Sequence, residues 1–154
     1  MMIILMALAF LPATVGASSA TPTPSASVPP DAAIIENSGS TNFAGYRIVV
    51  TPDGSAWLTL DGGQAVKAQL PAAHARSLFA HLAAAGPLDS LEVGRCVKSA
   101  SFGTRTFIEW KGVRTGDVSC GGGQTAQLNA DVEAILADLQ VKPTPRRPAP
   151  PQPG

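Results

Sequence analysis

The sequence has little of the chemistry by which proteins are most easily assigned to a function. It contains two cysteines, two histidines and few aromatic residues (five Phe, two Trp and one Tyr), and its eleven basic side chains are balanced by eleven acidic ones. Nucleic-acid recognition needs a concentrated positive face with aromatic side chains among it, so this composition argues against a nucleic-acid partner. The cysteines are too far apart in the sequence for a Cys-x-x-Cys redox motif.

An apolar run long enough to form a membrane span is also missing. The run Met1–Leu11 is interrupted by Pro12, whereas a single span needs about 20 apolar residues. Small residues follow Pro12, a pattern typical of an export signal, although no Lys or Arg precedes the apolar run. We therefore predict a signal peptide over residues 1–20, cleaved after Ala17 or Ala20, and a secreted or periplasmic protein with no membrane span when mature.

Proline is concentrated at the two ends of the remaining chain. Residues 21–33 are rich in Pro, Ser and Thr, and residues 142–154 read KPTPRRPAPPQPG. Because proline fixes φ and removes a backbone donor, such segments form neither helices nor paired strands. We predict a linker over residues 21–33, a single domain over residues 34–141 and a disordered tail over residues 142–154.

The first half of the domain shows strand patterns followed by a helix pattern. Tyr46–Thr51 and Trp57–Leu60 flank the turn sequence Pro-Asp-Gly, which predicts a hairpin. Gln64–Leu70 alternates polar and apolar residues and predicts a third strand. A helix is expected from Pro71 until the Gly-Pro pair at residues 86–87, with one apolar stripe. The stripe consists of Pro71, Ala75, Leu78, Phe79 and Leu82.

The second half predicts another hairpin and another helix. Thr104–Trp110 and Val113–Cys120 are expected to be strands joined at Lys111-Gly112, with Glu109 facing Arg114. Apolar residues at helical spacing follow, with Asn129 as the expected cap of a helix that starts at Ala130. These residues are Leu128, Val132, Ile135, Leu136 and Leu139. The three glycines at 121–123 precede no Gly-Lys-Ser or Gly-Lys-Thr sequence, so they predict a connector and not a phosphate loop.

Together these elements predict an α+β fold. The order is β-β-β-α, then two or three strands, then α, with an antiparallel sheet covered on one face by the two helices. In an exported protein a lone pair of cysteines is most simply structural, so we predict a Cys96–Cys120 disulfide. The bridge fastens the segment that holds the least apolar pair of strands, where a covalent link can replace missing core.

The two histidines do not indicate a metal site. His74 and His81 lie seven residues apart on the first helix, about 10.5 Å along its axis, which is too far for both imidazoles to hold one ion. Both fall at the edge of the apolar stripe, as boundary residues do. We predict no metal and no cofactor.

For function the sequence leaves two hypotheses. The first is a non-enzymatic binding or accessory module that contacts another exported protein or a small ligand, because no nucleophile motif or telling pair of carboxylates is present. Its expected contact is the hydroxyl-rich loop that holds Lys98, Ser99, Ser101 and Arg105, and no catalytic residue is predicted. The alternative is a small hydrolase or transferase assembled in space from His74 or His81, Asp117 and one of Ser99, Ser101 or Ser119.

Overall fold

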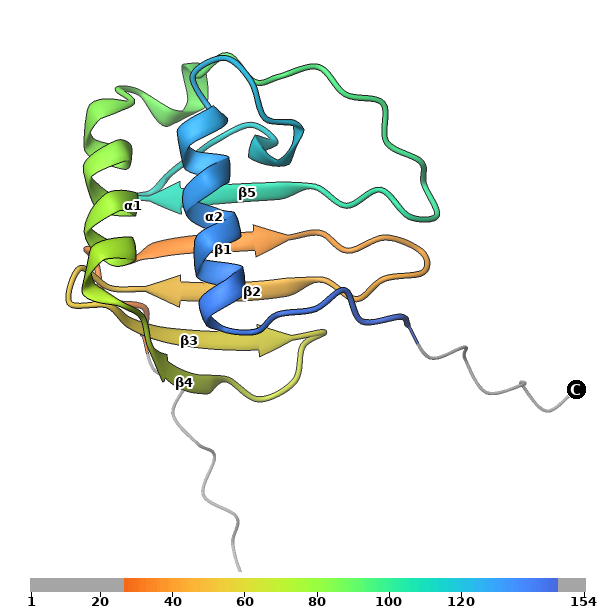
Figure 1. Cartoon of the computed structure of the whole chain (residues 1–154), viewed down its shortest axis with the longest axis horizontal. Coiled ribbons are helices and arrows are strands. Elements are labelled where there is room, and N and C mark those ends of the chain that lie inside the picture. Colours follow the sequence, from red (N-terminus) through yellow and green to blue (C-terminus); the bar gives the residue numbers. More distant parts are fainter. Residues whose placement is uncertain (1–26, 147–154) are drawn as a thin grey trace, which may run out of the picture.

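Two helices lie across a twisted antiparallel sheet (Figure 1). The computed structural model describes residues 27–146, so the predicted signal peptide at residues 1–20 lies outside the described residues. The strands are β1 (Ala33–Asn37), β2 (Tyr46–Val50), β3 (Ser55–Leu60), β4 (Val66–Gln69), β5 (Thr106–Trp110) and β6 (Val113–Arg114). The helices are α1 (Ala72–Ala84) and α2 (Ala126–Asp138), with short 3-10 turns at Leu88–Ser90 and Val118–Cys120.

The six strands are ordered β4-β3-β2-β1-β5-β6, and every neighbouring pair is antiparallel. The predicted α+β class and the disulfide are confirmed. Strand β1 was not predicted, although it lies between β2 and β5 in the middle of the sheet. Its sequence, Ala-Ile-Ile-Glu-Asn, is short and directly follows the proline-rich segment, and the turn at Pro30-Asp31 that precedes it falls inside the predicted linker.

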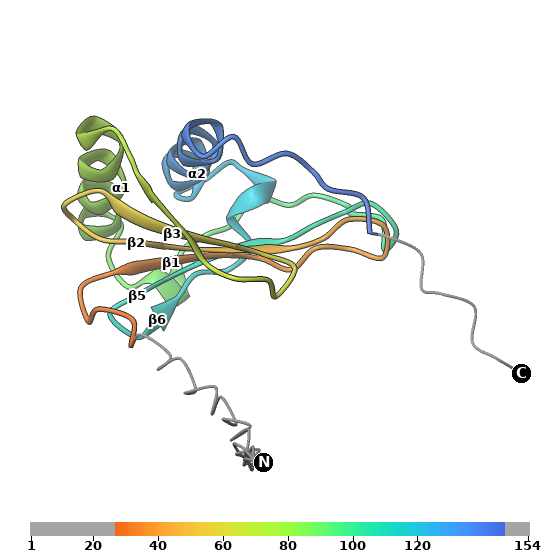
Figure 2. The same ribbon diagram turned by 90° about the horizontal axis from the view of Figure 1, so that it is seen from below.

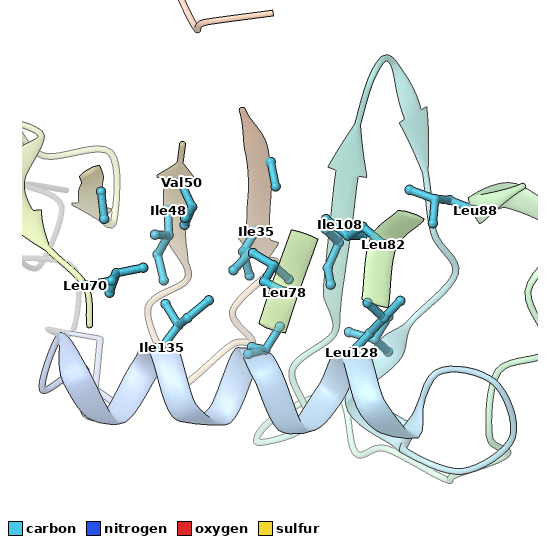
Figure 3. Close-up of a cluster of buried hydrophobic side chains, with 14 of the residues drawn as sticks. Ile35, Ile48, Val50, Leu70, Leu78, Leu82, Leu88, Ile108, Leu128 and Ile135 are labelled. Atoms are coloured by element: carbon cyan, nitrogen blue, oxygen red, sulfur yellow. The ribbon is translucent and has the colours of Figure 1, made fainter. Parts of the chain in front are cut away.

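Both helices cover the same face of the sheet, as predicted (Figure 2). The core between the layers is built from cross-strand rows of side chains that the register aligns. One row runs Leu58, Ile48, Ile35 and Ile108 across β3, β2, β1 and β5. Leu78 and Leu82 from α1, and Leu128 and Ile135 from α2, pack over this row (Figure 3). Val132 of α2 belongs to the same core. Burying each such side chain contributes about 1.5 to 3 kcal/mol.

Two of the predicted element boundaries are wrong, and each error has its own physical reason. The strand expected over Val113–Cys120 ends at Arg114, because at the buried Thr115 only the backbone N–H still pairs with β5, donating to the Ile108 carbonyl at 2.9 Å. The Ile108 N–H donates to Thr115 Oγ1 instead of to a backbone carbonyl, at 3.0 Å. Helix α2 begins at Ala126 and not at Ala130. The buried Thr125 stands at the N-cap position without a side-chain cap bond, and its carbonyl already accepts the Asn129 N–H at 2.9 Å, so the helical hydrogen bonds start before the predicted cap at Asn129.

Histidine–aspartate pairs join the two helices. The Nδ1 atoms of His74 and His81 each lie 2.6 Å from a carboxylate oxygen, of Asp138 and Asp131 respectively. Ser77 also donates to Asp131, at 2.7 Å. The seven-residue spacing of the histidines is thus matched by a seven-residue spacing of aspartates on α2. Both histidines therefore connect α1 to α2. Asp131 is 7% exposed and is the more buried of the two aspartates.

Removing the buried carboxylate is expected to loosen the helix pair. Asp131→Ala should lower the free energy of unfolding by about 2 kcal/mol, because it leaves Ser77 and His81 without their partner. Asp138→Ala is the matched control and should cost less than about 1 kcal/mol, since the contact of Asp138 with His74 is more exposed. Urea unfolding followed by tryptophan fluorescence measures both. Equal losses in the two variants would contradict this assignment.

Candidate functional site

One row of the helix-facing sheet surface is polar where its neighbours are apolar. The register places Leu60, Tyr46, Asn37 and Thr106 side by side across β3, β2, β1 and β5. This polar row follows directly on the core row that contains Ile35. Because alternate residues of a strand share a face, both rows point toward the helix layer. On β2, β1 and β5 the helix-facing side chains therefore change from apolar to polar between one row and the next, whereas β3 keeps a leucine in both rows.

The polar row is held together by its own hydrogen bonds. The Asn37 amide donates to Thr106 Oγ1 at 2.9 Å and to Thr104 Oγ1 at 3.1 Å. Its carbonyl oxygen accepts the Gly39 N–H at 2.9 Å, which fixes which way the amide points. These three hydrogen bonds to the neighbouring strand and loops fix the Asn37 side chain, so the polar row is preorganised.

Tyr46 keeps its proton in this environment. Burial raises the pKa of its phenol, hydrogen bonds with Thr106 and Asn37 lower it, and the negative charge of Glu133 on α2 raises it; the net direction is upward. The phenol is therefore neutral at ordinary pH and carries an O–H group that can donate.

A cleft of about 760 Å³ opens over the polar row. Apolar side chains form its opposite walls: Leu136 and Val141 from the end of α2 and beyond, and Phe43 and Phe102 from two loops. The rings of Phe43 and Phe102 are in contact, with centroids 6.0 Å apart. Charged side chains of both signs, including Asp61, Glu133, Lys142 and Arg146, also line the cleft. Its volume falls in the range typical of small-molecule sites.

The chain segment after α2 forms one side of this cleft. We call residues 141–146 the strap. Its backbone pairs with the loop before β2: the Ala44 N–H donates to the Thr144 carbonyl at 2.9 Å, and the Arg146 N–H donates to the Asn42 carbonyl at 2.8 Å. Residues 142–146 belong to the segment for which the sequence predicts a disordered tail, and the pairing holds them against the domain. Residues 147–154 of that segment lie outside the described residues.

Lys98, the first of the sequence-predicted binding residues, is engaged within the fold. Its ammonium group lies 3.0 Å from Asp117 Oδ2 and donates to the Thr104 carbonyl at 2.6 Å and to the Ser119 hydroxyl. Its side chain is 14% exposed. The cation is thus directed inward, toward the turn at Val118–Cys120.

The other three predicted residues make no side-chain hydrogen bond to Lys98 within the described residues, and none of them lines the cleft. Ser99 Oγ accepts the Phe102 N–H at 3.0 Å within a tight turn, and the Ser101 carbonyl accepts the Asn42 N–H at 3.1 Å. Arg105 is exposed on the strand side of the loop. The loop reaches the cleft through Phe102 and Thr104 instead, and none of the four predicted side chains lines the cleft.

The arrangement that the enzymatic hypothesis needs is not formed. In residues 27–146 the hydrogen bonds of both imidazoles go to aspartates on α2, and neither goes to a serine hydroxyl or to Asp117. Ser119 instead donates to Asp117 at 2.6 Å. Neither histidine lines the cleft. Within the same residues no group of three or more metal-ligating side chains comes together.

Sequence reasoning missed Asn37 and Tyr46, the centre of the polar row. Tyr46 was interpreted as an ordinary strand residue, and Asn37 belongs to the strand that was not predicted. A signal was present: Tyr46, Ile48 and Val50 share a face, and so do Asn37, Ile35 and Ala33, so each strand carries one polar group on its apolar side. Finding it requires knowing that both strands are neighbours.

Comparison with protein-family models, with curated proteins and with solved structures found no match to this chain. The helices of the described part of the chain are all too short or too polar to cross a membrane. The disulfide is compatible with an extracellular or periplasmic location.

Proposed function

We propose that this protein is an exported, non-enzymatic binding module that holds a small amphipathic ligand in the cleft between the polar row and the strap. One observation carries the proposal. The sheet presents a preorganised polar row, with Asn37 and Tyr46 at its centre, to a cleft of about 760 Å³ that also has an apolar wall of Phe43, Phe102, Leu136 and Val141. Sites of this kind combine an apolar lining with a few fixed polar groups that orient the ligand.

The lining indicates the chemical class of the ligand. An apolar or aromatic body fits against Phe43, Phe102 and Leu136, and one polar group meets the neutral phenol of Tyr46. Acidic and basic side chains are both present in the lining, so the cleft selects neither strong anions nor strong cations. An uncharged molecule with one hydrogen-bonding end satisfies these conditions.

Export is supported by two independent features. The amino-terminal sequence has the pattern of a signal peptide, and the two cysteines form a disulfide, which persists in oxidising compartments. A secreted or periplasmic location follows from the two together.

The proposal is tested with small amphipathic probes and two variants. Phenylbutanol and N-acetylphenylalaninamide are titrated into the labelled protein while amide chemical shifts are recorded by NMR. We expect shifts centred on Asn37, Tyr46 and Thr106, with a Kd on the order of 1 mM for probes of this size. Ala137→Trp places an indole in the cleft and should weaken binding at least tenfold, because Ala137 lines it.

Ala130→Trp is the matched control. Ala130 is also an exposed alanine of α2, but it is not part of the cleft lining, so this variant should bind the probes as the unmodified chain does. The proposal fails if neither probe shifts the polar row, or if Ala137→Trp binds them undiminished.

A further inference from the structure

The strap is bound to the domain in the way that an extended peptide is bound to the edge of a sheet. Phe43 and Pro145 face each other in an antiparallel bridge. On either side of that bridge, the Ala44 N–H and the Asn42 carbonyl make backbone hydrogen bonds to the strap. We call residues 42–44 the docking edge. The main contacts are therefore made by backbone groups, which recognise an extended chain whatever its side chains are.

Hydrogen bonds that do not involve the strap hold the docking edge in its conformation. The Asn42 N–H donates to the Ser101 carbonyl and the Thr41 hydroxyl to the Ala100 carbonyl, at 3.1 and 3.2 Å. The Ser40 N–H donates to the Phe43 carbonyl at 2.9 Å and closes the turn. These bonds do not involve the strap, so the docking edge keeps its donor and acceptor in place when the strap is displaced.

The spacing of the hydrogen bonds explains why proline fits here. The strap uses the carbonyl of Thr144 and the N–H of Arg146, and Pro145 lies between them with no bond required of its nitrogen. In an antiparallel ladder the residue at such a position has no hydrogen-bonding role, so proline is tolerated there and prevents pairing in a shifted register. The Arg146 guanidinium adds a bond from Nε to the Phe43 carbonyl at 3.3 Å.

From this geometry we infer that the docking edge is a peptide-binding site. Its partner is an extended segment of another exported protein, in which a proline is followed by arginine, and which pairs with residues 42–44 as Thr144–Arg146 do. The strap occupies the site within the same chain. Because a tethered segment acts at an effective concentration in the millimolar range, a partner competes with it and binds tightly only when the strap is weakened.

The full-length chain carrying Arg146→Pro tests this inference. The substitution removes the N–H that bonds to the Asn42 carbonyl and the guanidinium that reaches Phe43. The probe is the acetylated and amidated peptide VKPTPR, the sequence of residues 141–146. We expect amide shifts at Asn42, Phe43 and Ala44, and a Kd at least tenfold lower than for the unmodified chain. Arg76→Ala, which removes an exposed cation from α1, outside the strap and the cleft lining, should bind like the unmodified chain.

A second peptide isolates the backbone hydrogen bond. VKPTPR with a methyl group on the backbone nitrogen of its arginine lacks the donor to the Asn42 carbonyl and should bind at least tenfold more weakly. The inference is overturned if both peptides bind equally, if the shifts lie elsewhere, or if none occur while the amide signals of Ile35 and Ile108 show an intact fold. Probe binding in the cleft is measured separately on the unmodified chain, so failure of one proposal is distinguishable from failure of the other.

Discussion

Replacing both cysteines by serine is expected to lower the free energy of unfolding by about 3 to 4 kcal/mol. Cys96 and Cys120 are joined across a sequence separation of 24 residues. Cross-linking a loop of this length removes conformational freedom from the unfolded chain, and the chain-entropy relation gives that magnitude. Urea unfolding of the double variant and of the unmodified protein measures it. Unmodified protein treated with reductant should show the same loss.

The loss should also be visible locally, because the segment between Leu91 and Thr106 has little core of its own. Val97 and Phe102 are exposed, and the middle of the segment is held mainly by hydrogen bonds of the Ala100 and Ser101 carbonyls with residues 40–42. Gly94 packs so closely on the Gly121 carbonyl that a Cβ would lie 1.6 Å from the oxygen. We expect amide exchange across residues 94–103 to accelerate far more than exchange in β1. A loss under about 1 kcal/mol, with unchanged exchange, would show that this packing holds the segment without the bridge.

The parts of the fold that the sequence predicts are those fixed by local signals. Lys111 and Gly112 both adopt positive φ, as the two-residue hairpin turn requires, and Glu109 faces Arg114 as predicted. The apolar stripe of α1 is buried at Ala75, Leu78 and Leu82. In each case residues within a few positions of one another determine the conformation, so the pattern contains enough information.

The missed parts depend on contacts between distant residues. Strand β1 is defined by pairing with β2 and β5, and Ile34, Ile35 and Glu36 give no periodic signal by themselves. The same holds for the site. Asn37 meets Thr106 across 69 positions of sequence, and the strap meets Phe43 across about a hundred, so no spacing in the sequence reveals the cleft.

Asp117→Ala is expected to lower the free energy of unfolding by about 3 kcal/mol. The carboxylate connects three parts of the chain: Oδ1 accepts the N–H groups of Thr106 and Ser119 at 3.0 and 3.1 Å, and Oδ2 lies 3.0 Å from the Lys98 ammonium. The side chains of the ion pair are 14% and 15% exposed. Removing the carboxylate leaves a largely buried ammonium without its counter-charge, which costs more than the loss of one hydrogen bond.

The contribution of Asp117 should depend on pH in a defined direction. Burial by itself raises the pKa of this carboxyl, but the hydrogen bonds from Ser119, Lys98 and Thr106 and the positive charge of Lys98 outweigh it, so the pKa lies below the ordinary value of 3.8. The folded state therefore holds the proton less tightly than the unfolded state does. The stabilisation is fully present above the unfolded pKa and is lost as the pH falls through the folded pKa.

Asp117→Asn separates this contribution from the shape of the side chain. The amide oxygen can still accept from the backbone of Thr106 and Ser119, but the charge opposite Lys98 is gone, so we expect a loss of about half that of Asp117→Ala near neutral pH. That difference from the unmodified protein should shrink as the pH falls below about 3.8, where Asp117 of the unfolded chain takes up its proton, and further through the lower pKa of the folded state. Asp89→Asn is the control: Asp89 is exposed and its carboxylate makes no hydrogen bond or ion pair within residues 27–146, so its effect should be near zero. A loss at Asp117 that persists unchanged at low pH would mean that the polar contacts matter and the charge does not.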